Sequence, residues 1–195
     1  MKMVRYLLVY VVNNYGQFNH LILRALRDLD MSDLDVELVP NSLSPSEIME
    51  EKPSGLVLGG GPSLEKAGMC VEYVRKLDIP ILGICLGHQL IALALGGKVR
   101  KGRRGGYASV EVEVIDEDVI LKGLGPSLKV WASHQDEVSV LPPNFMKLAR
   151  SEVCEIEAMA HMHKPIFGVQ WHPEVIHTEK GEQLFRNFIA VCMKK

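Results

Sequence analysis

The sequence has 195 residues, enough for one ordinary α/β domain but cramped for two. Hydrophobic residues make up 47% of it and the formal net charge is −2, which excludes a disordered chain and argues against nucleic acid or an anionic membrane as the main partner. The longest apolar run, Tyr6–Val12, is far shorter than the roughly 18 residues that span a bilayer. We therefore expect residues 1–195 to form a single globular domain.

Predicted strands and helices alternate through the first half of the chain. Strands are predicted at Arg5–Val12, Val36–Val39, Gly55–Leu58 and Ile79–Ile84. Helices are predicted over Phe18–Leu29, from a capping box with proline at Ser44–Glu47, over Cys70–Leu77 and over Leu86–Leu95. This order predicts an α/β fold with an open, doubly wound, mostly parallel sheet flanked by helices.

The second half reads differently, because Val110–Val114 alternates with the period of a strand that has one solvated face. Further short strands are predicted at Lys129–Ala132, Met146–Arg150, Ile156–Ala160 and Ile166–Val169. A last helix is predicted over Lys180–Met193. We expect these strands to form a small antiparallel extension of the sheet.

Four cysteines occur, and no two are close enough in sequence for a zinc ribbon or an obvious disulfide framework: Cys70, Cys85, Cys154 and Cys192. A reduced, cytoplasmic protein is the simplest interpretation. Cys70 and Cys192 lie on apolar helical faces and are expected in the core.

Cys85 stands apart because it lies in Gly83-Ile84-Cys85-Leu86-Gly87, where a predicted strand meets a predicted helix. Glycines two residues to either side of a nucleophile permit the tight turn of a nucleophile elbow. The helix N-terminus adds partial positive charge, which favours a thiolate. The pattern predicts that Cys85 is a nucleophile above the carboxyl edge of the sheet, rather than a buried structural cysteine.

A proton carrier for this thiolate is expected in His172-Pro173-Glu174, which also follows a predicted strand. Residues two apart in an extended segment share a face, so Glu174 can accept a hydrogen bond from His172. Gly59-Gly60-Gly61-Pro62 follows a third strand, and its free N–H groups are suited to an oxyanion hole.

In this order and spacing, the three motifs resemble the class I (triad) glutamine amidotransferases. The resemblance implies catalytic residues Cys85, His172 and Glu174. It also implies an oxyanion hole formed by Leu86 with Gly61, or with Gly60 as a near alternative. The amino-acid end of glutamine would be held by Gln89, Ser133 and His134.

Within that family, Trp131–Val138 and Val169–Gly181 look like the glutaminase part of GMP synthases, most like the separate glutaminase (A) subunit of two-subunit archaeal enzymes. The sequence lacks the length and the phosphate-binding motif of an ATP-pyrophosphatase. The resemblance therefore implies a partner subunit that carries the synthetase activity with its ATP and Mg, and no cofactor or metal on this chain. Asp136 is expected to take part in coupling to that partner.

Other interpretations remain open: an amidotransferase subunit of another synthase, a stand-alone γ-glutamyl hydrolase, or a catalytically silent homologue. Gly106 replaces a glutamate that many relatives carry. The basic cluster Arg100–Arg104 is expected to be a solvated loop, and Arg103–Ala108 and Ser133–Glu137 are expected to be loops that respond to a partner. His161 and His163 lack a suitable third ligand nearby and are expected in a polar loop.

Overall fold

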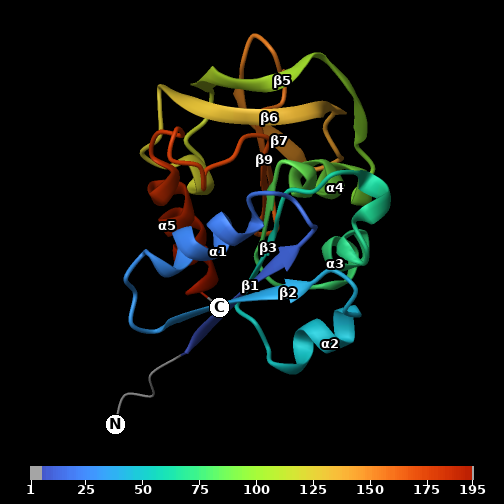
Figure 1. Ribbon diagram of the computed structural model, residues 1–195, viewed down its shortest axis with the longest axis vertical. Helices are drawn as coiled ribbons and strands as arrows, with labels where there is room; N and C mark the ends of the chain where they lie inside the picture. The colour runs from blue at the N-terminus through green and yellow to red at the C-terminus, as the bar shows by residue number, and fades with distance from the viewer. Residues whose placement is uncertain (1–5, 195) are drawn as a thin grey trace.

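The computed structural model describes residues 6–194, and their strands form a single nine-stranded sheet in the order β2-β1-β3-β4-β9-β8-β7-β5-β6 (Figure 1). Parallel pairing joins the first five strands of this order, and antiparallel pairing joins the rest. The predicted combination of a doubly wound parallel sheet and an antiparallel extension is therefore confirmed.

The parallel half consists of five short strands. Their bounds are Leu7–Asn13 (β1), Leu34–Pro40 (β2), Gly55–Leu58 (β3), Ile81–Ile84 (β4) and Ile166–Val169 (β9). β3, β4 and β9 are apolar and buried throughout, as expected of strands covered on both faces. Their carboxyl ends lead into the glycine loop, Cys85 and the His-Pro-Glu segment, which brings the three motifs to one edge.

The antiparallel half is dominated by a long hairpin. Its strands are Lys98–Val114 (β5) and Ser127–Val140 (β6), followed by the shorter Phe145–Arg150 (β7) and Ala158–His161 (β8). The expected strands at Val110–Val114 and Lys129–Ala132 are only parts of β5 and β6. The predictions of loops at Arg100–Arg104, Arg103–Ala108 and Ser133–Glu137 are wrong, because all three segments belong to β5 or β6, whose pairing has a register shift between Lys101 and Gly106.

Helices cover both faces of the sheet. α1 (Asn19–Arg27) and α5 (Gly181–Cys192) pack on one face, and α2 (Pro45–Glu50), α3 (Cys70–Lys76) and α4 (Leu86–Ala94) pack on the other (Figure 1). Two 3-10 turns, Leu64–Lys66 and Val119–Leu121, complete the elements. Ser44 and Glu47 form the predicted capping box at the start of α2.

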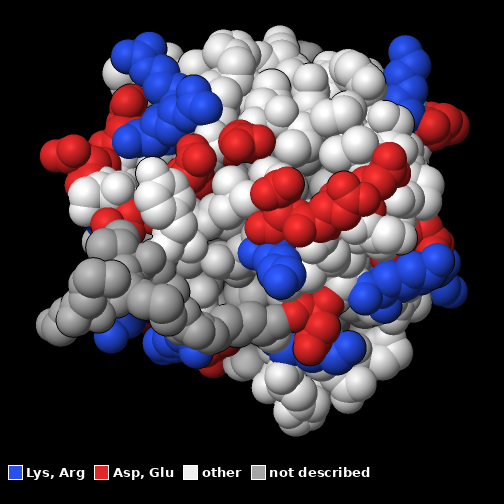
Figure 2. Space-filling view, turned by 90° about the horizontal axis from the view of Figure 1, so that it is seen from below, with Lys and Arg blue, Asp and Glu red and all other residues white. Residues whose placement is uncertain are grey.

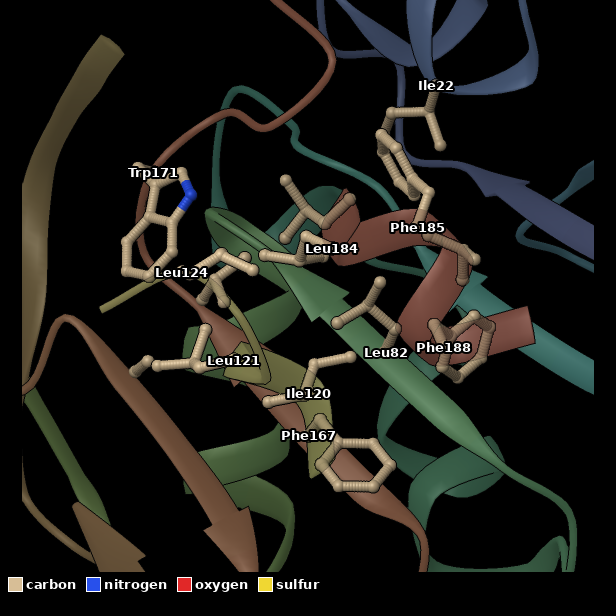
Figure 3. Close-up of a cluster of buried hydrophobic side chains, with 14 of the residues drawn as sticks. Ile22, Leu82, Ile120, Leu121, Leu124, Phe167, Trp171, Leu184, Phe185 and Phe188 are labelled. Atoms are coloured by element: carbon tan, nitrogen blue, oxygen red, sulfur yellow. The ribbon is translucent and has the colours of Figure 1, made fainter. Parts of the chain in front are cut away.

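The layer under α5 illustrates how the sheet is held. Phe185 and Phe188 of α5 are fully buried in one hydrophobic cluster with Leu82 of β4 and Phe167 of β9 (Figure 3). Burying each such side chain contributes about 1.5–3 kcal/mol, so this layer fixes β4 and β9 relative to each other. These are the two strands that carry the cysteine and histidine motifs.

The face seen from below in Figure 1, on the side of β2 and α2, mixes acidic and basic side chains, with an acidic band flanked by Lys and Arg (Figure 2). This agrees with the near-neutral net charge. No helix within residues 6–194 is long and apolar enough to cross a membrane. Arg5, the expected start of the first strand, and the side chains of residues 103–107, including the Gly106 departure, lie outside the described residues.

Candidate active site

Cys85 lies between β4 and α4 with a left-handed backbone, at φ 54° and ψ −103°. A residue other than glycine in this region costs about 1–3 kcal/mol, and such strain is concentrated at functional turns. Gly83 and Gly87 make the turn possible, because a side chain on Gly83 would collide with Gly87 and one on Gly87 with the carbonyl group of Leu58. The structure thus has the predicted nucleophile elbow.

The end of β9 places the histidine beside it. The Cys85 N–H donates to the carbonyl oxygen of Val169 at 2.9 Å, which joins the elbow to the strand that precedes His172. His172 Nδ1 donates to Glu174 Oε1 at 2.7 Å, and the Glu174 side chain is fully buried. The predicted His172–Glu174 pair is therefore present, with Pro173 between them.

Opposing influences act on the pKa of His172. Burial lowers it, whereas hydrogen bonds with Cys85 and Glu174 and the negative charges of both partners raise it, and the net result is a pKa of about 10. The imidazolium form is consequently favoured across neutral pH. A charged histidine between a thiol and a carboxylate stabilises a thiolate at position 85.

The main chain around His172 is also fixed. Its N–H donates to the carbonyl oxygen of Trp131 at 3.0 Å, and its carbonyl oxygen accepts from Thr178 Oγ1 at 2.7 Å. Thr178 Oγ1 in turn accepts from the Trp131 N–H at 2.9 Å. The Phe18 ring meets the imidazole edge-on, with centroids 4.9 Å apart. Sequence reasoning gave neither Phe18 nor Thr178 a role in the site, although Thr178 lies within the segment Val169–Gly181 that carries the resemblance.

The glycine loop, Gly59–Pro62, lies beside Cys85 and His172. A Cβ on Gly60 would lie 3.3 Å from His172 Cε1 and 3.9 Å from Cys85 Cβ, and a Cβ on Gly61 would collide with Asn14 and Leu86. Asn14, fully buried, donates from Nδ2 to the carbonyl oxygen of Gly59 at 3.0 Å and so anchors the loop. Sequence reasoning gave Asn14 no role in the site, because its partner, Gly59, is 45 residues away in the sequence.

These groups open into a cavity of about 770 Å³ that contains all the predicted site residues except Glu174, which is buried behind His172. Its lining includes Cys85, Leu86, Gln89, Gly60, Gly61, Ser133, His134, Asp136 and His172. The carbonyl oxygen of Ser133 lies 3.6 Å from Cys85 Sγ, so strand β6 forms the wall beside the nucleophile. The cavity is large enough for a small amino acid.

Gln89 and His134 are both tied to β6. Gln89 Nε2 donates to the carbonyl oxygen of Asp136 at 2.7 Å and to Gln170 Oε1 at 3.2 Å. His134 Nδ1 donates to the same carbonyl oxygen at 3.0 Å, and burial lowers the pKa of His134. The Asp136 carbonyl oxygen therefore links α4, which carries Gln89, to strand β6 of the hairpin.

Glu137 and the two histidines, His161 and His163, make structural contacts away from Cys85. Glu137 is buried and paired with Arg100 of β5, whose Nε and Nη2 both lie 2.9 Å from Glu137 Oε1, so Glu137 is not a surface charge. His161 Nδ1 accepts the N–H groups of His163 and Lys164 in a turn. Residues 6–194 contain no group of three potential metal ligands, counting histidine, cysteine, aspartate and glutamate.

The other three cysteines are buried and differ from Cys85 in their surroundings. Burial raises the pKa of Cys70 and of Cys192 to about 12, and it also raises that of Cys154. None of the three lines the cavity. The expectation that Cys70 and Cys192 belong to the core is confirmed.

A cysteine on a strained elbow, a histidine–glutamate pair and a glycine loop around one cavity define a class of amide-hydrolysing enzymes with a cysteine nucleophile. Residues 10–192 match the family model for "Glutamine amidotransferase class-I", and the chain belongs to this family of enzymes.

Similar proteins include the A subunit of the glutamine-hydrolyzing GMP synthase of Methanosarcina barkeri, 62% identical over 95% of this chain and 97% of that protein. The corresponding A subunit of Methanothermobacter thermautotrophicus is 55% identical over 95% and 98%. A crystal structure from Thermoplasma acidophilum, described as a GMP synthase A-subunit protein, superposes with a TM-score of 0.90 at 39% identity, covering 97% of this chain and 95% of that one. A glutamine amidotransferase from Thermotoga maritima, 20% identical with a TM-score of 0.73 over 97% and 99%, shares the fold.

Proposed function

We propose that this chain is the glutaminase subunit of a GMP synthase. The observation that carries the proposal is the strained Cys85 beside a buried His172–Glu174 pair, in a chain 62% identical to a GMP synthase A subunit over nearly its full length. In this reading, the synthetase activity, with its ATP and Mg, belongs to a separate ATP-pyrophosphatase subunit that converts XMP to GMP.

The first half of the reaction forms a thioester. The Cys85 thiolate attacks the side-chain carboxamide carbon of glutamine, and the oxygen that becomes negative is stabilised by the N–H of Leu86 and an N–H of Gly61 or Gly60. The His172 imidazolium, held by Glu174, gives its proton to the departing nitrogen. Ammonia leaves and the glutamyl group remains on Sγ.

The second half restores the enzyme. Neutral His172 removes a proton from water, which attacks the thioester carbonyl carbon through the same oxyanion site. Collapse of the intermediate releases glutamate and the Cys85 thiolate, while the proton stays on the histidine. Glutamine and water are thereby converted to glutamate and ammonia, and the ammonia passes to the partner.

The test is to reconstitute the chain with an ATP-pyrophosphatase subunit, then to measure glutamine-dependent GMP formation from XMP and ATP. We expect GMP formation and faster glutamine hydrolysis in the complex than in the lone chain. The absence of GMP formation with an active partner subunit would contradict the proposal. Equal rates of glutamine hydrolysis with and without the partner would favour a stand-alone γ-glutamyl hydrolase. Charge reversal at Asp136 should weaken stimulation by the partner more than basal hydrolysis. Asp33→Lys, at an exposed residue just before β2, should change neither.

A further inference from the structure

Gln89 has a side-chain amide whose orientation is fixed by its neighbours. A carbonyl oxygen can only accept a hydrogen bond, so the 2.7 Å contact with the Asp136 carbonyl requires Nε2 of Gln89 to point there. The second hydrogen on this nitrogen is taken by Gln170 Oε1 at 3.2 Å. Both donors of Gln89 are therefore used within the protein.

The oxygen of the same amide is left for a ligand. No donor among the residues that the structure describes reaches Gln89 Oε1, and Gln89 lines the cavity that contains Cys85. A neutral acceptor in a cavity that Asp136 also lines suits an ammonium group. This step rests on the proposed function, in which the cavity holds the amino-acid end of glutamine.

Gln170 bears the energetic cost of this arrangement. It is fully buried directly after β9, and its Nε2 has no hydrogen-bond partner, a condition that costs about 1–3 kcal/mol. Turning the Gln170 amide over would present its NH₂ group to the NH₂ group of Gln89, which can only repel it. The buried donor stays unsatisfied because Gln170 must offer its oxygen to Gln89.

We propose that Gln170 is a positioning residue that holds the Gln89 amide with its oxygen toward the cavity, and thereby sets the preference of the site for ligands with an α-ammonium group. Gln170 does not touch the reacting atoms. Its effect passes through Gln89 alone, so it should alter ligand discrimination and leave the reactivity of the Cys85 thiol unchanged.

The test uses two chloroketones that differ only in the α-amino group, 2-amino-5-chloro-4-oxopentanoate and 5-chloro-4-oxopentanoate. With either one, Cys85 Sγ forms a bond to the chlorine-bearing carbon and chloride leaves. The ratio of the two labelling rates measures recognition of the ammonium group. Iodoacetamide, which lacks both amino-acid groups, reports the intrinsic reactivity of the thiol.

In Gln170→Met, which keeps the length and loses the acceptor oxygen, we expect the ratio to fall about tenfold while the iodoacetamide rate stays within about twofold. Gln170→Glu, which restores an acceptor, should recover much of the ratio. Gln183→Leu on α5 removes an exposed amide that donates to Asn187; it is the control and should retain the wild-type ratio. If Gln170→Met does not fold, Gln170→Leu is used in its place.

An unchanged ratio in a folded Gln170 variant would overturn the inference. Failure of the proposed function looks different, because the wild-type protein itself would then show no preference for the amino chloroketone or would be labelled at another cysteine. A wild-type preference that survives in the Gln170 variant would refute only the positioning role.

Discussion

Replacing Glu174 by glutamine keeps the shape of its side chain and removes its charge. The Nδ1–Oε1 contact is 2.7 Å and the carboxylate is fully buried, so solvent does not screen the interaction. Hydrogen bonds to charged groups contribute about 1.5–3 kcal/mol, which corresponds to a rate loss of about 10- to 100-fold in glutamine hydrolysis. His172→Ala removes the proton carrier itself and should cost more, about 10²- to 10⁴-fold.

The pH dependence gives a sharper readout. The pKa of His172 is about 10 because Cys85 and Glu174 outweigh burial. Without the glutamate charge, burial remains and the pKa must fall. Raising the pH through neutrality should then remove the imidazolium in the variant while the wild-type protein keeps it.

The assay is iodoacetamide labelling of Cys85 between about pH 6 and pH 9. We expect a nearly flat rate for the wild-type protein over this range, and a rate that starts lower and climbs with pH in Glu174→Gln. Glu182→Gln, which removes a charge from an exposed ion pair on α5, should behave like wild type. A flat profile in the Glu174 variant would refute the assignment of its carboxylate as the support of the imidazolium.

Three further predictions address the nucleophile, the oxyanion loop and the hairpin. Cys85→Ala should abolish glutamine-dependent synthesis in the reconstituted complex but leave synthesis from added ammonia intact; loss of both in an assembled complex would contradict this division. Gly16→Ala places a methyl group against the carbonyl group of Gly60, and because a shift of about 1 Å can cost roughly 10²-fold, glutaminase turnover should fall strongly while iodoacetamide labelling persists. Arg100→Met leaves the buried Glu137 unpaired and should lower the free energy of unfolding, measured in denaturant, by about 1–3 kcal/mol. Arg24→Met, in an exposed ion pair with Asp28, should lower it by less than about 1 kcal/mol. Equal losses in the two variants would mean that burial of Glu137 is unimportant.

The chemistry-bearing part of the site could be predicted because it follows from local rules. Glycines at fixed offsets around Cys85 demand a tight strand-to-helix turn, and Pro173 holds His172 and Glu174 in an extended segment. The carboxyl ends of neighbouring parallel strands then meet at one edge without further information. The structure places the three motifs together as these rules require.

The hairpin could not be predicted in the same way. Its register depends on contacts between residues that lie from 14 (Glu113 with Ser127) to 42 positions apart (Lys98 with Val140). Polar residues such as Ser133 and His134 also carry a weak strand signal. The roles of Asn14 and Gln170 are also long-range, since each acts through a hydrogen bond to a distant segment. Sequence alone does not show which distant segment such a residue contacts.

The attachment of β6 gives the hairpin a mechanical role. Ser133, beside the Cys85 sulfur, is six residues from the start of β6, or about 20 Å along the strand. A rotation of β6 by about three degrees about its first residue would therefore displace the Ser133 carbonyl group by about 1 Å. Trp131 lies on the same arm and is bonded through its main chain to His172 and Thr178. A partner that displaces the far side of the hairpin would therefore shift the groups that contact Cys85 and His172 at the same time.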